Sequence, residues 1–242
     1  MADTEQSIQR LPRFYLPPDL FSENQVQLRK PDIHYLRKVL RLNPGDKFAA
    51  LDGRDKAWIC SLSEEMNGYF EADYPAVTSR APRLRVGLAL CKNSRFEDAI
   101  EMLSELGVAQ IIPLATERSE KKAPSESKLK RWKKIAESAS ILAYRMSPLT
   151  ILPIHKLENF PFEDDESSFF CHPVEEGTRQ KLSSSSSKIS LLIGPEGGFS
   201  TREVNWMAQR AGILSLGPLN LRVATAAVVA SSLALNTPAK GM

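Results

Sequence analysis

The sequence predicts an α/β protein whose main domain is a parallel sheet covered by helices on both faces, preceded by a small β-barrel-like domain. From Arg85 onward, short apolar segments alternate with segments whose apolar residues recur at helical spacing, which is typical of parallel α/β folds. Before Pro75, by contrast, several short strand-like segments surround a single helix. We therefore expect two domains, over residues 1–76 and 83–242.

The first domain contains a recognisable hairpin. Residues 47–51 and 57–62 are apolar segments that flank an Asp52-Gly53 turn, a pair of residues that favours tight reversals of the chain. Residues 13–16 and 68–72 predict two further strands. Several short strands around one helix suit a small barrel. The stretch between the two domains contains prolines and basic residues, as expected for a linker.

The second domain alternates strands and helices in order. The expected strands are residues 85–91, 108–112, 168–171, 189–193 and 213–216. Two of the helices are introduced by capping-box patterns, which place a serine three residues before a glutamate, at Ser94 and Ser200. Gly107 lies where a helix C-cap is expected. Another helix follows an apolar stripe between residues 129 and 139, and a last one begins near Ala224.

Two loops of this domain are candidate ligand sites. The first, Gly-Pro-Glu-Gly-Gly-Phe-Ser over residues 194–200, leaves a buried strand and enters a capped helix. Ligands bind at the carboxyl ends of parallel strands, and glycines let them approach the backbone. The second loop, residues 216–222, has the same setting and would carry a positive charge, Arg222, into a shared cleft. Neither loop matches a nucleotide phosphate motif. From its residues alone, the first loop fits a tight strand-to-helix turn as well as it fits a ligand site. Arg222, taken alone, would be interpreted as part of a surface salt bridge.

Taken together, the two loops resemble the C-terminal knot of the SPOUT methyltransferases. Further segments resemble the small-subunit ribosomal RNA methyltransferase E family and follow one another in the same order along nearly the whole chain. They are Arg13-Phe14, residues 34–41 with Gly45-Asp46, residues 105–108, Pro113 and residues 116–119.

The resemblance implies a PUA-like RNA-binding barrel followed by a SPOUT domain tied in a trefoil knot. It also implies a homodimer that transfers a methyl group from S-adenosylmethionine to N3 of one uridine in 16S ribosomal RNA, within the small ribosomal subunit. By the matching motifs, the methyl-donor site is expected to contain Gly194, Glu196, Gly197, Leu216, Gly217, Leu221, Arg222 and Thr225, with His172 at its border.

Methylation of N3 requires that its proton is removed and that the resulting charge on a uracil oxygen is stabilised. A fixed cation is suited to this task. Arg13 and Arg222 are the candidate catalytic residues, and the sequence offers no evident general base.

This chain departs from the family at two places. Val223-Ala224 stands where the family carries Thr-Glu, and Ile141-Leu142 where it carries Glu-Gln, although Arg145 is retained. These changes leave open a relative that binds RNA with weakened or lost activity. A SPOUT methyltransferase for another RNA, such as transfer RNA, is a second alternative. A metabolic nucleotide-binding enzyme is disfavoured because both phosphate motifs are missing.

The expected helix of the first domain carries a row of basic residues. His34, Arg37, Lys38 and Arg41 follow a spacing of i, i+3, i+4 and i+7, and no aromatic residue interrupts that row; Arg29 and Lys30 precede it. Such a row is often only a solvated face. A ribosomal RNA substrate favours contact with phosphates instead, so we expect Arg29, Lys30, Arg37, Lys38 and Arg41 to bind RNA.

Composition limits the remaining possibilities. The net charge of +3 is only mildly basic. The three cysteines are far apart, which indicates neither a metal site nor a disulfide framework and fits the reducing cytoplasm. No apolar run reaches the roughly 18 residues that a membrane helix needs, and the N-terminus does not resemble a signal peptide.

Overall fold

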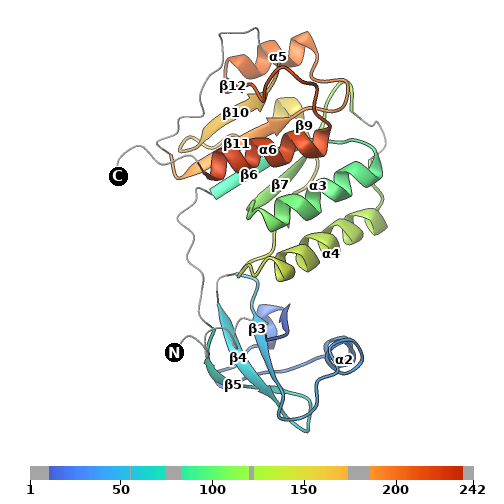
Figure 1. Ribbon diagram of the computed structural model, residues 1–242, viewed down its shortest axis with the longest axis vertical. Coiled ribbons are helices and arrows are strands. Elements are labelled where there is room, and N and C mark those ends of the chain that lie inside the picture. The colour runs from blue at the N-terminus through green and yellow to red at the C-terminus, as the bar shows by residue number, and fades with distance from the viewer. Residues whose placement is uncertain (1–10, 55, 75–82, 120–122, 174–185, 237–242) are drawn as a thin grey trace. The chain divides into compact units, whose positions relative to one another are not determined.

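The chain divides into two compact units. The structure is a computed structural model that describes residues 11–54, 56–74, 83–119, 123–173 and 186–236 (Figure 1). Met1–Thr78 and Tyr144–Pro148 make up the first unit, and Ser79–Ala143 and Leu149–Met242 the second. We call Tyr144–Pro148 the strap. It belongs with the first unit although it lies far along the sequence. The expected linker lies outside the described residues.

The first unit is a five-stranded sheet. Its strands are β1 (Arg13–Tyr15), β2 (Gln25–Val26), β3 (Lys47–Leu51), β4 (Ala57–Leu62) and β5 (Gly68–Asp73), in the order β1-β3-β4-β5-β2. The predicted hairpin is confirmed, since β3 and β4 pair antiparallel and Gly53 has a positive φ of 69° in their turn. Phe14 and Phe48 stack in the core of this unit, with ring centroids 5.3 Å apart.

The basic helix is shorter and less regular than its spacing predicts. It begins as α2 (Lys30–His34) and widens into a π-helical turn, η2 (Tyr35–Val39), where the amide of Leu40 donates to the carbonyl of Tyr35 over 3.0 Å. Arg41 then adopts a φ of +57° outside the helix. The prediction of one continuous helical face through Arg41 is therefore wrong. Pro44 follows shortly afterwards and cannot continue a helix.

The second unit is built on a seven-stranded sheet in which all pairs are parallel. Its strands are β6 (Arg83–Ala89), β7 (Gln110–Ala115), β8 (Thr150–Ile151), β9 (His155–Lys156), β10 (Ser167–Cys171), β11 (Lys188–Ile193) and β12 (Gly212–Leu214). The order is β12-β10-β11-β6-β7-β8, and β9 also pairs with β7. Strands β10, β11 and β12, which matter most for the site, are therefore neighbours.

Helices cover both faces of this sheet, as the sequence predicts (Figure 1). They are α3 (Asn93–Glu105), α4 (Glu126–Leu142), α5 (Thr201–Ala208) and α6 (Val223–Leu235), with a short 3-10 turn η3 (Leu157–Asn159). One face packs against α3, α4 and α6, where Phe96 stacks on Trp132 at 4.3 Å. The other packs against α5 through Met207 and against Phe160, just after η3.

Two of the three predicted helix caps are present in the structure. Ser200 and Glu203 form the predicted capping box of α5, because each side chain accepts the other's amide. The prediction at Ser94 is wrong, since α3 begins two residues earlier than that capping box implies, with Lys92 as its N-cap and no side-chain cap. Gly107 ends α3 with a φ of +91°, a conformation that glycine adopts without strain.

A buried arginine joins β6 to the segment that precedes β10. Arg85 is only 3% exposed and donates to Glu163 Oε1 (2.7 Å), Glu166 Oε2 (2.9 Å) and the carbonyl of Pro161 (3.0 Å). The Glu166 side chain is fully buried and also accepts the hydroxyl of Ser190 over 2.6 Å. This network lies at the amino-terminal ends of the strands, away from the loops that carry the predicted site.

Candidate functional site

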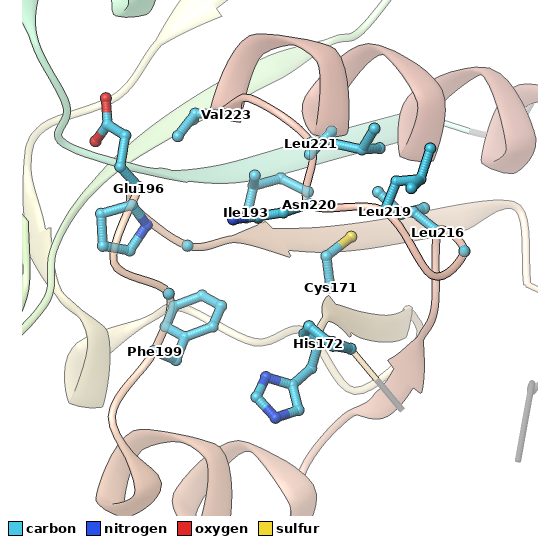
Figure 2. Close-up of a pocket in the computed structure, with 16 residues that line it drawn as sticks. Cys171, His172, Ile193, Glu196, Phe199, Leu216, Leu219, Asn220, Leu221 and Val223 are labelled. Atoms are coloured by element: carbon cyan, nitrogen blue, oxygen red, sulfur yellow. The ribbon is translucent and has the colours of Figure 1, made fainter. Parts of the chain in front are cut away.

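A pocket lies at the carboxyl ends of three neighbouring parallel strands (Figure 2). Cys171 and His172 reach it from β10, Ile193 from β11, the loop 216–221 from beyond β12, and the first turn of α6 closes it. Its enclosed volume is about 150 Å³. Typical ligand sites measure roughly 300–1,000 Å³, so a ligand of ordinary size would be only partly enclosed here.

The structure brings the two predicted loops together in this pocket. The predicted site residues that line it are Gly194, Glu196, Leu216, Gly217, Leu221 and His172. The other residues that line it were not among the predicted donor-site residues. They are Cys171, Pro173, Ile193, Pro195, Gly198, Phe199, Leu219, Asn220, Val223 and Ala226. Most of these belong to the same two loops, so the loop motifs already marked the region. The family motif marked the first turn of α6 through Thr225, but the residues of this turn that line the pocket are Val223 and Ala226.

Arg222 and Thr225 do not line the pocket. Arg222 is the N-cap of α6, and both side chains are exposed. Val223 and Ala226, each one position further along, face the pocket instead. Because residues three apart lie on the same side of a helix, this one-residue offset places the predicted pair on an adjacent side. Their roles stay predictions.

The glycine loop is held from two sides. The Glu196 carboxylate accepts Arg95 Nη1 of α3 over 2.7 Å, and the carbonyl of Gly197 accepts Arg118 Nη1 over 2.8 Å. A Cβ atom at Gly197 would lie 3.5 Å from the Arg118 side chain, so Gly197 faces that arginine and is not part of the pocket lining. The sequence marked residues 116–119 as a family motif but gave Arg118 no role.

A buried carboxylate fixes the start of α5 just beyond this loop. Glu203 is 3% exposed, and its Oε1 accepts the amide of Glu117 over 2.8 Å while its Oε2 serves the capping box. Glu117 in turn accepts Arg202 Nε over 2.6 Å. The hydrogen bond from Arg202 lowers the pKa of Glu117 below its ordinary value, so this exposed link is present at neutral pH and is lost on acidification.

Two glycines are required at the rim of the pocket. A Cβ atom at Gly194 would meet the ring of Phe199 at 3.2 Å, and Gly217 has a φ of +113°. Side chains would crowd the first position and strain the second. Gly194 is therefore packed closely against Phe199, whereas nothing lies within 4 Å of the Cβ position of Gly217. The walls of the pocket are largely aliphatic, as at Ile193, Leu216 and Leu221.

The titratable groups of the pocket are few. Burial raises the pKa of the Cys171 thiol to about 12, so the thiol stays protonated at neutral pH and acts neither as a nucleophile nor as a base. Among the described residues that line the pocket there is no lysine or arginine. Within the described ranges, no three histidine, cysteine or acidic side chains gather in a way that could hold a metal ion.

The predicted residues of the first unit form a separate group. Arg13 is 6% exposed, donates from Nη2 to the hydroxyl of Tyr74 over 2.8 Å, and lies 3.7 Å from the ring centroid of Tyr144. Its guanidinium is thus enclosed by tyrosines and belongs to a different unit from Arg222. The basic side chains Arg29, Lys30, Arg37, Lys38 and Arg41 are all exposed. Of these, Arg29 is paired with Asp32 at 3.0 Å.

Comparisons with known proteins agree with this arrangement. Residues 79–235 match the model of an RNA methyltransferase domain, and residues 28–73 match that of an RNA methyltransferase PUA domain. Ribosomal RNA small subunit methyltransferase E of Synechocystis is 32% identical over 231 residues, which cover 90% of this chain and 75% of that protein. The protein of the same name from Bacillus subtilis is 27% identical, over 95% of this chain and 92% of its own length.

Solved structures share the fold. A methyltransferase from Legionella pneumophila, determined with the cofactor S-adenosylmethionine, superposes with a TM-score of 0.78 and 26% identity over 93% of this chain and 96% of its own. A ribosomal RNA small subunit methyltransferase E from Neisseria gonorrhoeae gives a TM-score of 0.79 at 24% identity, over 92% of this chain and 96% of its own.

Proposed function

Since the chain belongs to the ribosomal RNA small subunit methyltransferase E family, we propose that it methylates N3 of a uridine in 16S ribosomal RNA within the small subunit. The chain is an RNA methyltransferase with a PUA domain ahead of its methyltransferase domain, and S-adenosylmethionine is its methyl donor. The observation that carries the proposal is the pocket at the ends of β10, β11 and β12, built from the loops that resemble the donor-binding loops of the family.

The pocket fits the chemistry of this donor. Its aliphatic walls at Ile193, Leu216 and Leu221 suit a flat adenine ring, and the uncovered backbone at Gly217 suits the polar groups around it. The donor supplies a methyl group on a positively charged sulfur. None of the described residues that line the pocket carries a positive charge that would repel this sulfur.

The protein must also help the uridine lose the N3 proton. The negative charge left on a uracil oxygen is stabilised best by a fixed positive group. Arg222 is our candidate, because it is exposed at the N-terminus of α6, between the pocket residues Leu221 and Val223, and the helix dipole adds to its charge. Arg13 is enclosed by tyrosines, which favours a supporting role. Because Glu196 is paired with Arg95, we assign it a structural role in the glycine loop, and we propose that water accepts the N3 proton.

The direct test is methyl transfer to purified small ribosomal subunits. We expect incorporation from labelled S-adenosylmethionine and N3-methyluridine in digested 16S RNA by mass spectrometry. Donor binding without transfer would instead support the weakened relative that Val223-Ala224 leaves open. Methylation of transfer RNA, with none in subunits, would support the other alternative.

The basic side chains of the first unit are proposed to bind phosphates. Replacing Arg37, Lys38 and Arg41 together with alanine should weaken binding to the subunit. It should also flatten the dependence of log K on log salt by roughly two to three units, since each phosphate contact contributes about 0.7–0.9. Donor affinity, measured by calorimetry, should not change because these residues belong to the first unit. An unchanged salt dependence would contradict the proposal.

We further propose that the protein is a homodimer and works in the cytoplasm, where small subunits are found. Two exposed leucines of the second unit support association, Leu219 (78% exposed) on the pocket loop and Leu233 (47%) on α6. Light scattering should give twice the chain mass of 27.0 kDa; the mass of a single chain at micromolar concentration would refute the dimer.

The knot implied by the resemblance stays a prediction, since residues 174–185, between β10 and β11, lie outside the described ranges. No described helix is long and apolar enough to cross a membrane.

A further inference from the structure

Tyr144, the first residue of the strap, has a backbone conformation that its side chain disfavours. Its φ is +61°, in the left-handed region. That region is costly for a residue with a Cβ atom and is uncommon for a bulky one. Such conformations persist only where the surrounding structure holds them, and they concentrate at functional sites. The contacts around Tyr144 are therefore informative.

The ring of Tyr144 lies on a buried cation. The Arg13 guanidinium carbon is 3.7 Å from its centroid, well within the range of a cation–π contact. Arg13 cannot move freely, because it is 6% exposed, donates to the hydroxyl of Tyr74 over 2.8 Å, and lies 5.3 Å from the Tyr74 ring centroid. One face of the Tyr144 ring is thus fixed against a positioned guanidinium.

Two hydrogen bonds hold the strap after Tyr144, one at Arg145 and one at Ser147. The Tyr15 hydroxyl donates to the carbonyl of Arg145 over 2.9 Å, and the Ser147 hydroxyl donates to the carbonyl of Arg54 over 2.8 Å. Between them, Met146 packs against the apolar cluster of the first unit. These contacts fix the strap and explain how the left-handed residue is held.

Tyr144 is nevertheless 48% exposed. The strap is joined to the turn between β3 and β4 through the carbonyl of Arg54, and this turn carries the exposed side chains Arg54 and Lys56 as well as Asp52, whose carboxylate accepts the amides of both. A half-exposed aromatic ring with one face held on a buried guanidinium has the features of a stacking platform for an unpaired nucleic-acid base.

We propose that Tyr144 stacks on an unpaired base of the RNA substrate, with Arg13 as the positioning residue behind it. The proposal rests on the proposed function, which supplies RNA as the ligand. It is consistent with the chemistry, because N3 lies on the pairing edge of uracil and its methylation requires an unpaired base. The strap thereby adds a base-binding element to the phosphate-binding residues of the same unit.

The experiment compares variants that separate the ring from the backbone strain. Y144F keeps the ring and the left-handed residue, Y144L keeps only the Cβ and apolar bulk, and Y144G removes the ring and relieves the strain. We measure the affinity of the full-length protein for a single-stranded, uridine-rich oligoribonucleotide at several salt concentrations. Circular dichroism and thermal melting verify folding. Because Y144G removes strain, its fold is expected to be retained, and Y144L provides the second test if it is not.

Y144F should bind within about two-fold of the wild type, and both Y144L and Y144G should bind about ten-fold or more weakly. The salt dependence should be the same in all four proteins, because stacking releases no counterions. Folded Y144L and Y144G with wild-type affinity would overturn the proposal, as would Y144F as weak as Y144G. A weakened variant with a flattened salt dependence would overturn it too, since the loss would then be ionic.

The proposed function is tested separately. Methyl transfer by the wild type and calorimetric donor binding decide that function, whereas the affinity ratio between Y144F and Y144G needs no activity. A wild type that binds the oligonucleotide through Tyr144 without methylating subunits would leave the stacking site intact and remove the proposed reaction. If the wild type methylates subunits but all variants bind the oligonucleotide with equal affinity, the proposed reaction stands and the stacking site is refuted.

Discussion

Replacing Ala226 with phenylalanine should abolish useful binding of S-adenosylmethionine. Ala226 lines the pocket from the first turn of α6, where Leu221 and Val223 also contribute to the lining. A phenyl ring there occupies space that the donor needs, and forcing two groups into one space costs about 1–3 kcal/mol before lost contacts are counted. The expected result is a dissociation constant raised about 100-fold or more by calorimetry.

Two controls make this result specific. The fully buried alanines of α6, Ala227, Ala230 and Ala234, are unchanged, but Ala226 itself packs at the edge of the same core, so thermal melting is measured first to verify that A226F is folded. Leu142 is 73% exposed at the end of α4, and L142F adds the same ring outside the pocket. Unchanged donor affinity in a folded A226F protein would remove the methyl-donor site from this pocket, and an equal loss in L142F would show that the effect is not local.

Replacing Arg85 with methionine should cause a large loss of stability. Its side chain is 3% exposed, and its guanidinium is paired with Glu166, whose side chain is fully buried. Removing one partner of a buried ion pair leaves the other charge without compensation and typically costs about 3–5 kcal/mol. In a chain of this length that cost lowers the melting temperature by roughly 6–20 °C. Urea or thermal unfolding followed by circular dichroism measures the change.

The double variant R85M/E166M tests whether the loss of stability in R85M comes from the uncompensated charge of Glu166. When both charges are replaced by apolar groups of similar size, little desolvation penalty remains, so the double variant should be more stable than R85M alone. R202A removes only the exposed links to Glu117 and Glu158 and should leave the unfolding midpoint nearly unchanged. If the double variant were as unstable as the sum of its single changes, the loss would come from packing and not from an uncompensated charge.

Short sequence motifs correctly predicted turns and helix ends, which depend on residues close together in the sequence. The Asp52-Gly53 hairpin, the Ser200 capping box and the Gly107 helix end all formed as the sequence indicates, because each depends on backbone preferences within a few residues. The errors arose where such a signal competes with other contacts. Ser94 matches a capping box but lies inside α3, and the basic helix turns into a π-helical segment at Tyr35.

The sequence by itself therefore determined the parallel α/β class, the barrel-like first domain and the two glycine loops, because strand alternation, helical spacing and turn chemistry are encoded locally. Only the tertiary structure decided which side chains meet. It placed Ala226 in the pocket and Arg222 beside it, enclosed Arg13 between Tyr74 and Tyr144, and buried Arg85 with Glu166. These contacts join residues as much as 131 positions apart, and no local periodicity constrains them: they depend on which surfaces pack together once water has been excluded.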